Sequence, residues 1–279
     1  MPELSFGWLL LISVVAGFVG AMSGMGGGVV LIPALTLFHM HIKDAIALSI
    51  VSVIATSSGS AAAYVREHLT NLKIGMFLEM FTIIGALVGA AISLTAGQAM
   101  LFILFGVVLL ASAATLFFQR NREWKQPEHV DAGSRWLELN GSYHDQASGE
   151  DVQYQATRAY LGGPLMFGAG LIAGLLGIGA GALKVLIHDL VMGLPPKVST
   201  TTSNLIIGVT ALAGTSVFLA AGRIDPGKAV PIILGVSAGA FLGTRVLVRL
   251  RNRTVRRFFL IVLLVLGVEM IVRGIRGEL

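Results

Sequence analysis

The sequence has no cysteine, which excludes disulfide bonds, thiolate metal sites and cysteine nucleophiles. It also has little charge. Asp, Glu, Lys and Arg together make up 13% of its 279 residues, whereas a soluble domain carries about 25%. What the chain has instead is 55% hydrophobic residues and 35 glycines. This balance is typical of an integral membrane protein, and the length suits one helical domain in the bilayer.

The net charge of +5 would suggest a nucleic-acid partner in a soluble protein. Here the basic residues lie in the loops between apolar runs, so orientation in the membrane explains them better and no nucleic-acid partner is expected. The first residues lack a basic segment and a small-residue cleavage motif. We therefore expect the chain from Phe6 onward to be a mature membrane segment and not a signal peptide.

Apolar runs alternate with short polar segments along the chain, apart from one long polar stretch at 119–158. Five of the runs are about 20 residues or longer, which is enough to cross about 30 Å of hydrocarbon. The runs lie at 6–22, 29–39, 45–65, 74–95, 100–118, 160–176, 182–194, 199–221, 228–248 and 256–272. The pattern predicts an all-α protein that crosses the cell (inner) membrane several times.

Two glycine-rich stretches, Gly17–Gly28 and Gly170–Gly181, interrupt these runs. Each glycine costs a helix about 1 kcal/mol relative to alanine, so neither stretch favours continuous helix. A broken backbone at membrane depth is tolerated only where it is buried in protein or lines a cavity. Two broken segments in matching halves of a chain therefore indicate a transporter binding site.

The two stretches belong to an internal duplication. Offsets of 153 and 154 residues align glycines of the two halves, including Gly17 with Gly170, Gly28 with Gly181, Gly85 with Gly239 and Gly89 with Gly243. The chain is accordingly predicted to consist of a first transmembrane repeat at 1–118, a polar cytoplasmic linker at 119–159 and a second transmembrane repeat at 160–279. We expect the linker to be solvated.

The orientation of the repeats depends on whether each glycine-rich stretch crosses the membrane or turns back. A crossing would give parallel repeats, whereas a re-entrant hairpin would give inverted ones. The arginine-rich loop at 245–257 is expected in the cytoplasm, and only the hairpin arrangement places most other basic residues on the same side. The charges favour two inverted repeats, each with a glycine-broken re-entrant hairpin (or broken helix) and three transmembrane helices, with both termini outside.

The tips of the two hairpins are the predicted binding site. The second arm of each hairpin begins just after its glycines, so its first backbone N–H groups have no partner within the helix. Together with the helix dipole these groups form a site for an anion. The alternative is that the glycines only permit close helix packing. The tip glycines predicted to bind substrate are Gly24, Gly26, Gly27, Gly28, Gly177, Gly179 and Gly181.

Lys184 is the most informative single residue, since it lies three positions after Gly181 at the start of the second arm. A cation there is at the unfavourable end of the helix dipole, and an ammonium group at membrane depth costs at least about 2.5 kcal/mol. A bound anion would relieve both penalties, so Lys184 is predicted to contact the substrate. The alternatives are snorkelling to the surface and pairing with Asp189 or Glu79.

Hydroxyl groups follow both hairpins and suit oxyanion oxygens, because they donate hydrogen bonds without adding charge. Hydroxyls also join membrane helices, so some of these are expected to be structural. We predict substrate contacts from Ser49, Ser52, Thr202 and Ser203. Titratable residues within the membrane are candidates for proton coupling, and they are Glu79, His188 and Asp189. For His188 the alternative is a buried, hydrogen-bonded imidazole.

Two further patterns are interpreted as structural. Glu269 is expected to pair with Arg273 one helical turn later. Glycines spaced four apart predict faces where helices pack closely. These glycines are Gly85, Gly89, Gly235, Gly239 and Gly243.

Besides the glycine-rich turns, four short segments are distinctive, namely Ala45–Ser49, Lys197–Ser203, Gly222–Asp225 and Gly239–Gly243. Together they resemble the sulfite exporter TauE/SafE family, also called the toluene sulfonate uptake permeases. The resemblance covers both repeats and leaves out the linker. It implies a membrane transporter of sulfite or of organosulfonates such as sulfoacetate, without a covalent cofactor. Lys184 is not part of these motifs, so its role is argued from its position alone.

The sequence thus predicts a proton-coupled secondary transporter of small sulfur oxyanions or organosulfonates, with no cofactor, metal or catalytic residue. Its expected partners are the small anion and the lipid bilayer, and homodimerisation is left open. A passive anion channel would share every feature except the coupling acids. An intramembrane serine protease, with Ser23 and either His39 or His188 as a dyad, is disfavoured because the second repeat has Leu176 in place of Ser23.

Overall fold

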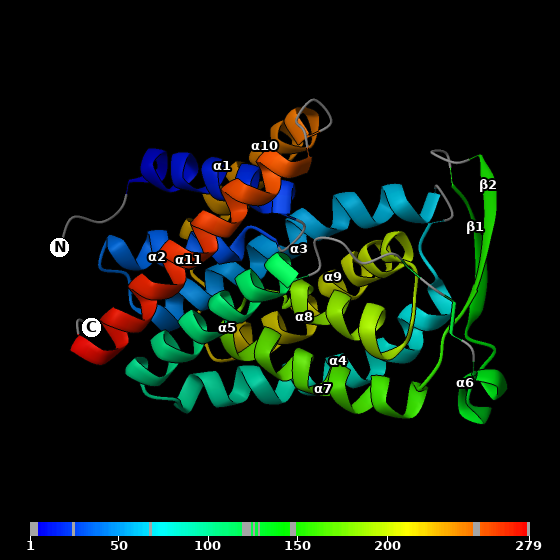
Figure 1. Cartoon of the computed structure of the whole chain (residues 1–279). Helices are drawn as coiled ribbons and strands as arrows, with labels where there is room; N and C mark the ends of the chain where they lie inside the picture. The colour runs from blue at the N-terminus through cyan, green and yellow to red at the C-terminus, as the bar shows by residue number, and fades with distance from the viewer. Residues whose placement is uncertain are drawn as a thin grey trace.

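The computed structural model describes residues 5–23, 26–66, 69–118, 124, 126–127, 129–145, 149–247 and 252–277. Helices dominate it, as a long bundle with the start of α1 and the end of α11 at one end (Figure 1). The first half contains α1 (Phe6–Ser23), α2 (Gly28–Leu37), α3 (Ile42–Arg66), α4 (Leu72–Thr95) and α5 (Gln98–Phe118). The second contains α7 (Ala159–Leu176), α8 (Gly181–Leu186), a π-helical turn (Ile187–Val191), α9 (Pro196–Ala220), α10 (Pro226–Leu247) and α11 (Asn252–Arg276).

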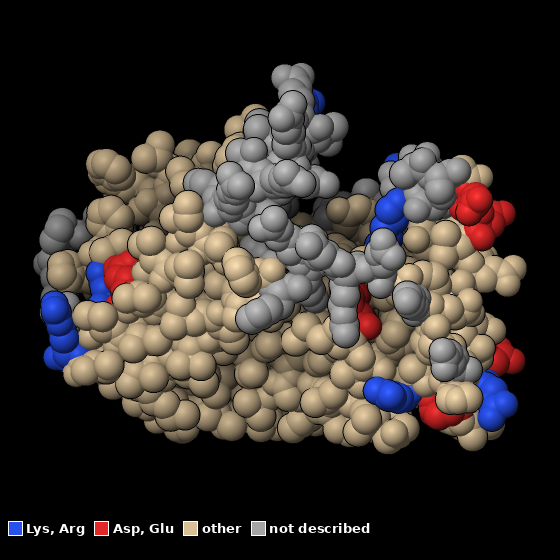
Figure 2. All heavy atoms as spheres, in the orientation of Figure 1, with Lys and Arg blue, Asp and Glu red and all other residues tan. Residues whose placement is uncertain are grey.

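The described helices confirm an all-α membrane protein. Five of them contain segments that are long and apolar enough to cross a bilayer, namely Leu72–Thr95, Gln98–Thr115, Ala159–Leu176, Pro196–Ala220 and Pro226–Gly243. Figure 2 shows what this means for the surface: on the face in view, a broad uncharged area separates charged residues at the two ends. Such a surface suits lipid around the middle and water at both ends.

Glycines allow the helices of the two halves to touch along their backbones. A side chain at Gly89 of α4 would overlap the carbonyl oxygen of Leu171 in α7, and one at Gly239 of α10 would overlap the carbonyl oxygen of Val14 in α1. The hydrophobic effect does not drive helices together in lipid, so their association depends on dispersion forces. Dispersion forces act only at short range and therefore require this close approach. The predicted packing role of the four-spaced glycines is confirmed.

The same contacts occur twice, related by the offsets found in the sequence. In α4 and α7 the contacts are Gly85 with Phe167, Gly89 with Leu171 and Thr82 with Gly170. In α10 and α1 they are Gly239 with Val14, Gly243 with Phe18 and Val236 with Gly17. Each half therefore contributes one glycine-faced helix and one hairpin arm to two equivalent interfaces.

Both glycine-rich stretches form hairpins. A Cβ at Gly20 would lie 2.6 Å from the Cα of Gly27, and at the other end of the arms the rings of Trp8 and Phe38 lie 6.4 Å apart. The second hairpin closes in the same way, because the backbone N–H of Thr157 donates to the carbonyl of Met192 over 3.0 Å. α2 thus returns beside α1, and α8 with the π-helical turn returns beside α7.

The linker differs from the solvated segment that the sequence predicts. Its described residues form the short helix α6 (Ala132–Trp136) and an antiparallel hairpin of β1 (Asn140–Asp145) and β2 (Glu150–Gln155), beside the bundle end opposite the chain termini (Figure 1). Tyr143 and Tyr154 are buried in one apolar cluster with Ile74 of α4 and Met192 of the second hairpin. The described part of the linker is thus folded and docked on the helices through a few apolar residues, while most of its side chains stay exposed or half-exposed to solvent.

Polar contacts attach the linker both to the second hairpin and to the start of α4. The indole N–H of Trp124 donates to the carbonyl of Gly193 over 2.9 Å, and the side-chain amide of Asn71 donates to the Tyr154 hydroxyl over 3.0 Å. Lys73 and Glu138 form an exposed ion pair of 2.7 Å, and this hydrogen bond holds the pKa of Glu138 below its usual value. The linker therefore joins α4 to the base of the second hairpin.

Candidate functional site

The tips of the two hairpins meet against α3. The hydroxyl of Ser49 in α3 donates to the carbonyl of Gly177 over 2.9 Å, and a Cβ at Gly28 would lie 2.9 Å from that same carbonyl oxygen. Cβ atoms at Gly26 and Gly179 would lie 3.2 Å and 3.1 Å from the two methyl groups of Val53. The glycines of both stretches therefore share one small volume, as the sequence predicts for two opposed hairpins.

Backbone conformation explains why the tips are glycine-rich. Gly26, Gly177 and Gly179 have φ values of +84°, +66° and +70°, which residues other than glycine rarely adopt. Ala180 also has a positive φ of +50°, directly before α8 begins. These turns reverse the chain within a few residues and point the N-terminal ends of the second arms toward the tips.

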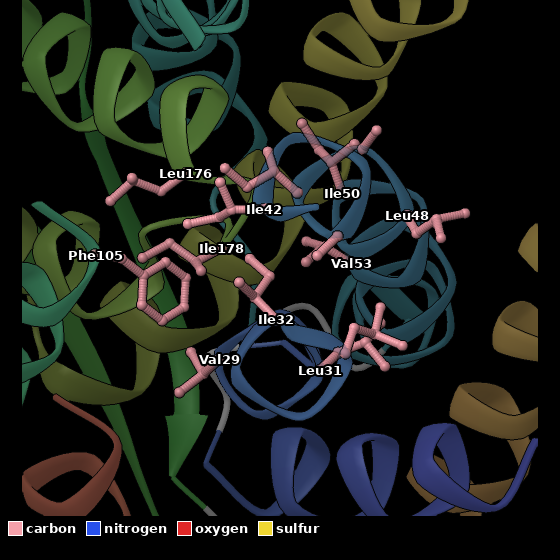
Figure 3. Packing of buried hydrophobic residues seen from close by; sticks show 14 of the residues in the cluster. Val29, Leu31, Ile32, Ile42, Leu48, Ile50, Val53, Phe105, Leu176 and Ile178 are labelled. Atoms are coloured by element: carbon pink, nitrogen blue, oxygen red, sulfur yellow. The ribbon is translucent and has the colours of Figure 1, made fainter. Parts of the chain in front are cut away.

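A packed apolar core surrounds the tips (Figure 3). Val29 and Ile32 of α2, Val53 of α3 and Ile178 of the second tip project into the same region, with the ring of Phe105 from α5 beside them. All five are buried. Water is thereby kept from the tips in this conformation, which strengthens every polar interaction made there.

Lys184 lies completely buried on α8 and does not reach the surface. Its ammonium group donates to the Thr210 hydroxyl of α9 over 2.8 Å. The same hydroxyl lies 3.2 Å from a carboxylate oxygen of Glu79 on α4. Glu79 itself is only 9% exposed. Snorkelling is therefore wrong, and of the two acids considered as partners the structure brings Glu79 to Lys184, through Thr210.

Thr210 shares a hydroxyl stripe of α9 with Ser199 and Ser203, but it is not among the residues predicted to contact substrate. It lies two helical turns after Ser203 on the same stripe of α9, and one turn after Ile207, whose methyl group packs 2.9 Å from a Cβ at Gly179. This hydroxyl stripe was the available signal. What the stripe could not indicate was that a cation and a carboxylate from other helices would converge on this member of it.

His188 and Asp189 lie at the base of the second hairpin. His188 is fully buried, and its Nδ1 lies 3.2 Å from the carbonyl of Ser199, so Nδ1 carries the hydrogen because a carbonyl only accepts. Among the described residues, neither Nε2 of His188 nor the hydroxyl of Ser199 has a hydrogen-bond partner. Asp189 is half-buried. A proton-coupling role for either residue stays a prediction.

The four predicted hydroxyl residues fall into two groups. Ser49 contacts a tip carbonyl directly, and the Ser203 hydroxyl lies 3.5 Å from the carbonyl of Gly181. Ser52 donates to a carbonyl of its own helix over 2.7 Å. Thr202 accepts the backbone N–H of Asn71 over 3.1 Å and so lies at the start of α4, away from the tips. Ser49 and Ser203 thus lie at the tips, and a contact of either with substrate stays a prediction.

The remaining predicted residues are placed as follows. Gly24 lies outside the described residues, and Gly27 packs against Gly20 within the first hairpin. Glu269 pairs with Arg273 over 3.0 Å, which confirms the structural role expected of it. In the part of the chain that the structure describes, no cluster of three or more His, Asp and Glu side chains could hold a metal ion.

Comparison with known proteins connects this arrangement to a family. Residues 9–270 match the family model described as sulfite exporter TauE/SafE. The chain is 26% identical over 280 residues to the probable membrane transporter protein YunE of Bacillus subtilis (strain 168), covering 98% of this chain and 99% of that protein. It is 26% identical over 238 residues to the probable membrane transporter protein YdhB of the same organism, covering 85% of this chain and 86% of that protein.

A plant relative matches a shorter part of the chain. The sulfite exporter TauE/SafE family protein 3 of Arabidopsis thaliana is 25% identical over 167 residues, covering 55% of this chain and 34% of that protein. No solved structure matches the chain. The family is one of transporters, so the serine protease alternative is not supported. The chain belongs to the sulfite exporter TauE/SafE family and is a multi-pass membrane transporter, not an enzyme.

Proposed function

We propose that this protein is a secondary transporter that moves small sulfur oxyanions or organosulfonates, such as sulfite or sulfoacetate, together with protons. The observation that carries the proposal is the fully buried Lys184, three residues after Gly181 of the second hairpin tip. An ammonium group enclosed at membrane depth needs a counter-charge. Glu79 can supply it in this structure, an anion bound at the tips would supply it in the loaded protein, and the family name indicates sulfur oxyanions.

The chemistry of the surrounding groups supports an oxyanion. The hydroxyls of Ser49 and Ser203 lie at the tips and can turn to donate to substrate oxygens in place of backbone carbonyls. The N-terminal N–H groups of α2 add donors without adding charge. One cation with several neutral donors suits a small anion whose charge is spread over several oxygens.

The closed tips support a mechanism of alternating access in preference to a continuous pore. Val53 separates the two tips, and a Cβ at Gly179 would lie 2.9 Å from a methyl group of Ile207, so side chains fill the space around the tips in this conformation. A substrate therefore requires the hairpins to separate from α3 and α9. A passive channel would instead need an open, polar route past the same residues.

We also infer that the two halves are inverted, as transporters of many folds are. Successive contacts advance in the same direction along α1 and α10, from Leu10 with Gly235 to Phe18 with Gly243. α1 and α10 therefore run parallel. Because α2 turns back and short connections join the later helices, α3 runs with α10 and against α9, its counterpart. These contacts support inversion, which labelling from the two sides of the membrane would test.

A ligand screen tests the proposed substrate class. Purified protein in detergent is heated with sulfite, sulfate, thiosulfate, sulfoacetate and aryl sulfonates, and chloride serves as the control anion. A ligand that binds the folded state stabilises it by mass action and so raises the melting temperature. At a ligand concentration one hundred times the Kd, the gain in the free energy of unfolding is about 2.7 kcal/mol. If no sulfur anion raises the melting temperature above the chloride control, the proposal is wrong. Flux into proteoliposomes under an imposed proton gradient then distinguishes a coupled transporter from a channel.

A further inference from the structure

Glu79 and Lys184 come from different halves of the chain and meet inside the protein. Glu79 lies on α4, Lys184 on α8, and the hydroxyl of Thr210 on α9 lies between them, 2.8 Å from the ammonium nitrogen and 3.2 Å from the carboxylate oxygen. The Thr210 hydroxyl accepts a hydrogen bond from Lys184, and its single hydrogen has two acceptors within reach, the carboxylate of Glu79 and, over 2.5 Å, the carbonyl of Ile206 in its own helix. The carboxylate is thus the counter-charge of Lys184 when no substrate is present.

Few other charged groups face this pair. The sequences of α5 and of α7 after its first turn contain no Asp, Glu, Lys, Arg or His. On α9, Lys197 lies exposed in the first turn, more than three helical turns before Thr210. The π-helical turn contributes His188 and Asp189, which lie one turn or more beyond Lys184. Glu79 is therefore the acid that is joined to Lys184 by a side-chain contact.

The pair occurs in one half only. At the offsets of the duplication, Leu31 corresponds to Lys184 and Ile233 corresponds to Glu79. Leu31 is completely buried in the apolar core, so the first hairpin keeps the packing without the charge. A feature needed only to hold hairpins against the bundle would be expected in both halves, because both have the same glycine contacts. The charged pair therefore has a role other than packing, one that is needed at a single site in the protein.

We propose that the substrate anion and the carboxylate of Glu79 compete for Lys184, and that a proton taken up by Glu79 releases the ammonium group for the anion. This inference depends on the proposed function. The empty site then holds Lys184 and an ionised Glu79, and the loaded site holds Lys184, a neutral Glu79 and one monovalent anion. Both states are neutral. An anion bound without the proton would leave an uncompensated charge in the bilayer, which costs several kcal/mol.

The competition sets both stoichiometry and substrate charge. One proton crosses with each anion, since the proton that neutralises Glu79 enters and leaves with the substrate. A monovalent anion, such as a monosulfonate or hydrogensulfite, completes the neutral site. Sulfate carries a second negative charge that no described group beside Lys184 balances, so it is predicted to bind more weakly than a monosulfonate of similar size.

Calorimetric titration of the purified full-length protein tests the proposal. Methanesulfonate and benzenesulfonate are the probes, because their single charge does not change between about pH 5.5 and pH 8.5, so any pH dependence belongs to the protein. In the wild type, affinity should rise by about tenfold per unit of decreasing pH while Glu79 is ionised. Glu79→Gln should bind with the low-pH affinity of the wild type at every pH at which Lys184 keeps its proton. Glu269→Gln, the same change at an acid paired with Arg273, should keep the wild-type pH dependence.

Proton uptake by the wild type provides a test that needs no variant. Titrations near pH 7.5 in buffers of different ionisation enthalpy should show about one proton taken up for each sulfonate bound. Sulfonate binding without proton uptake, or unchanged pH dependence in folded Glu79→Gln, overturns the competition and leaves the proposed function intact. Failure of the wild type to bind these sulfonates or any anion of the screen overturns the proposed function, and the competition with it.

Discussion

Replacing Lys184 by methionine separates a substrate contact from a purely structural charge. Methionine keeps the length and the unbranched shape of lysine, and it suits a side chain that is completely buried. The change removes the ammonium group and its hydrogen bond to Thr210. We expect the variant to insert and fold, and to lose affinity for the anion.

The expected loss of affinity follows from the interactions that the substitution removes. A charge-assisted hydrogen bond to a bound anion contributes about 1.5–3 kcal/mol, which corresponds to an affinity about 10- to 150-fold weaker. If the charge were only a partner for Glu79, the loss would appear in stability instead. Removing one member of a buried ion pair costs about 3–5 kcal/mol of the free energy of unfolding.

The assay measures the dissociation constant and the melting temperature on the same purified sample. Lys184→Arg should retain part of the affinity, because the charge persists while the planar guanidinium differs in geometry. The double variant with Glu79→Gln removes the unpaired carboxylate, so it should recover the melting temperature but not the affinity. A lower melting temperature with unchanged affinity of the folded fraction would refute the role of Lys184 in binding.

Three further predictions concern the tips, the membrane topology and the linker. Gly179→Leu should abolish transport while the protein still inserts, because its φ of +70° strains any side chain and its neighbours leave no space; near-normal flux would reduce the glycine to a packing residue. In this cysteine-free chain, cysteines placed at Ser142 and Gly277 should react with impermeant reagents from opposite sides of the membrane, and labelling from one side only would contradict inverted repeats. Gly141→Ala places a methyl group 2.5 Å from the Tyr154 hydroxyl, so it should loosen the linker and lower the melting temperature by a few degrees; an unchanged melting temperature would contradict its docking.

The sequence by itself determined the features that depend on local composition. Hydrophobic runs and scarce charge define a membrane protein, since the bilayer selects on these properties residue by residue. The glycine stretches predicted breaks, and both breaks are hairpin tips with positive φ at Gly26 and Gly179. Glycines spaced four apart predicted packing faces because one helical face repeats at that interval. The pair of Glu269 with Arg273 was predictable for the same reason.

Only the tertiary structure decided which distant groups meet. The sequence left Lys184 with several possible partners, and Glu79, more than one hundred residues earlier, is selected because α4 and α9 pack together and place Thr210 between the two charges. Thr202 looked equivalent to Ser203 on the chain, yet neighbouring residues of a helix point about 100° apart, and Thr202 is directed to Asn71 at the start of α4. The polar linker folds because its few apolar side chains find a docking surface on the helices. Contacts between helices depend on their relative placement, and local periodicity carries no information about that placement.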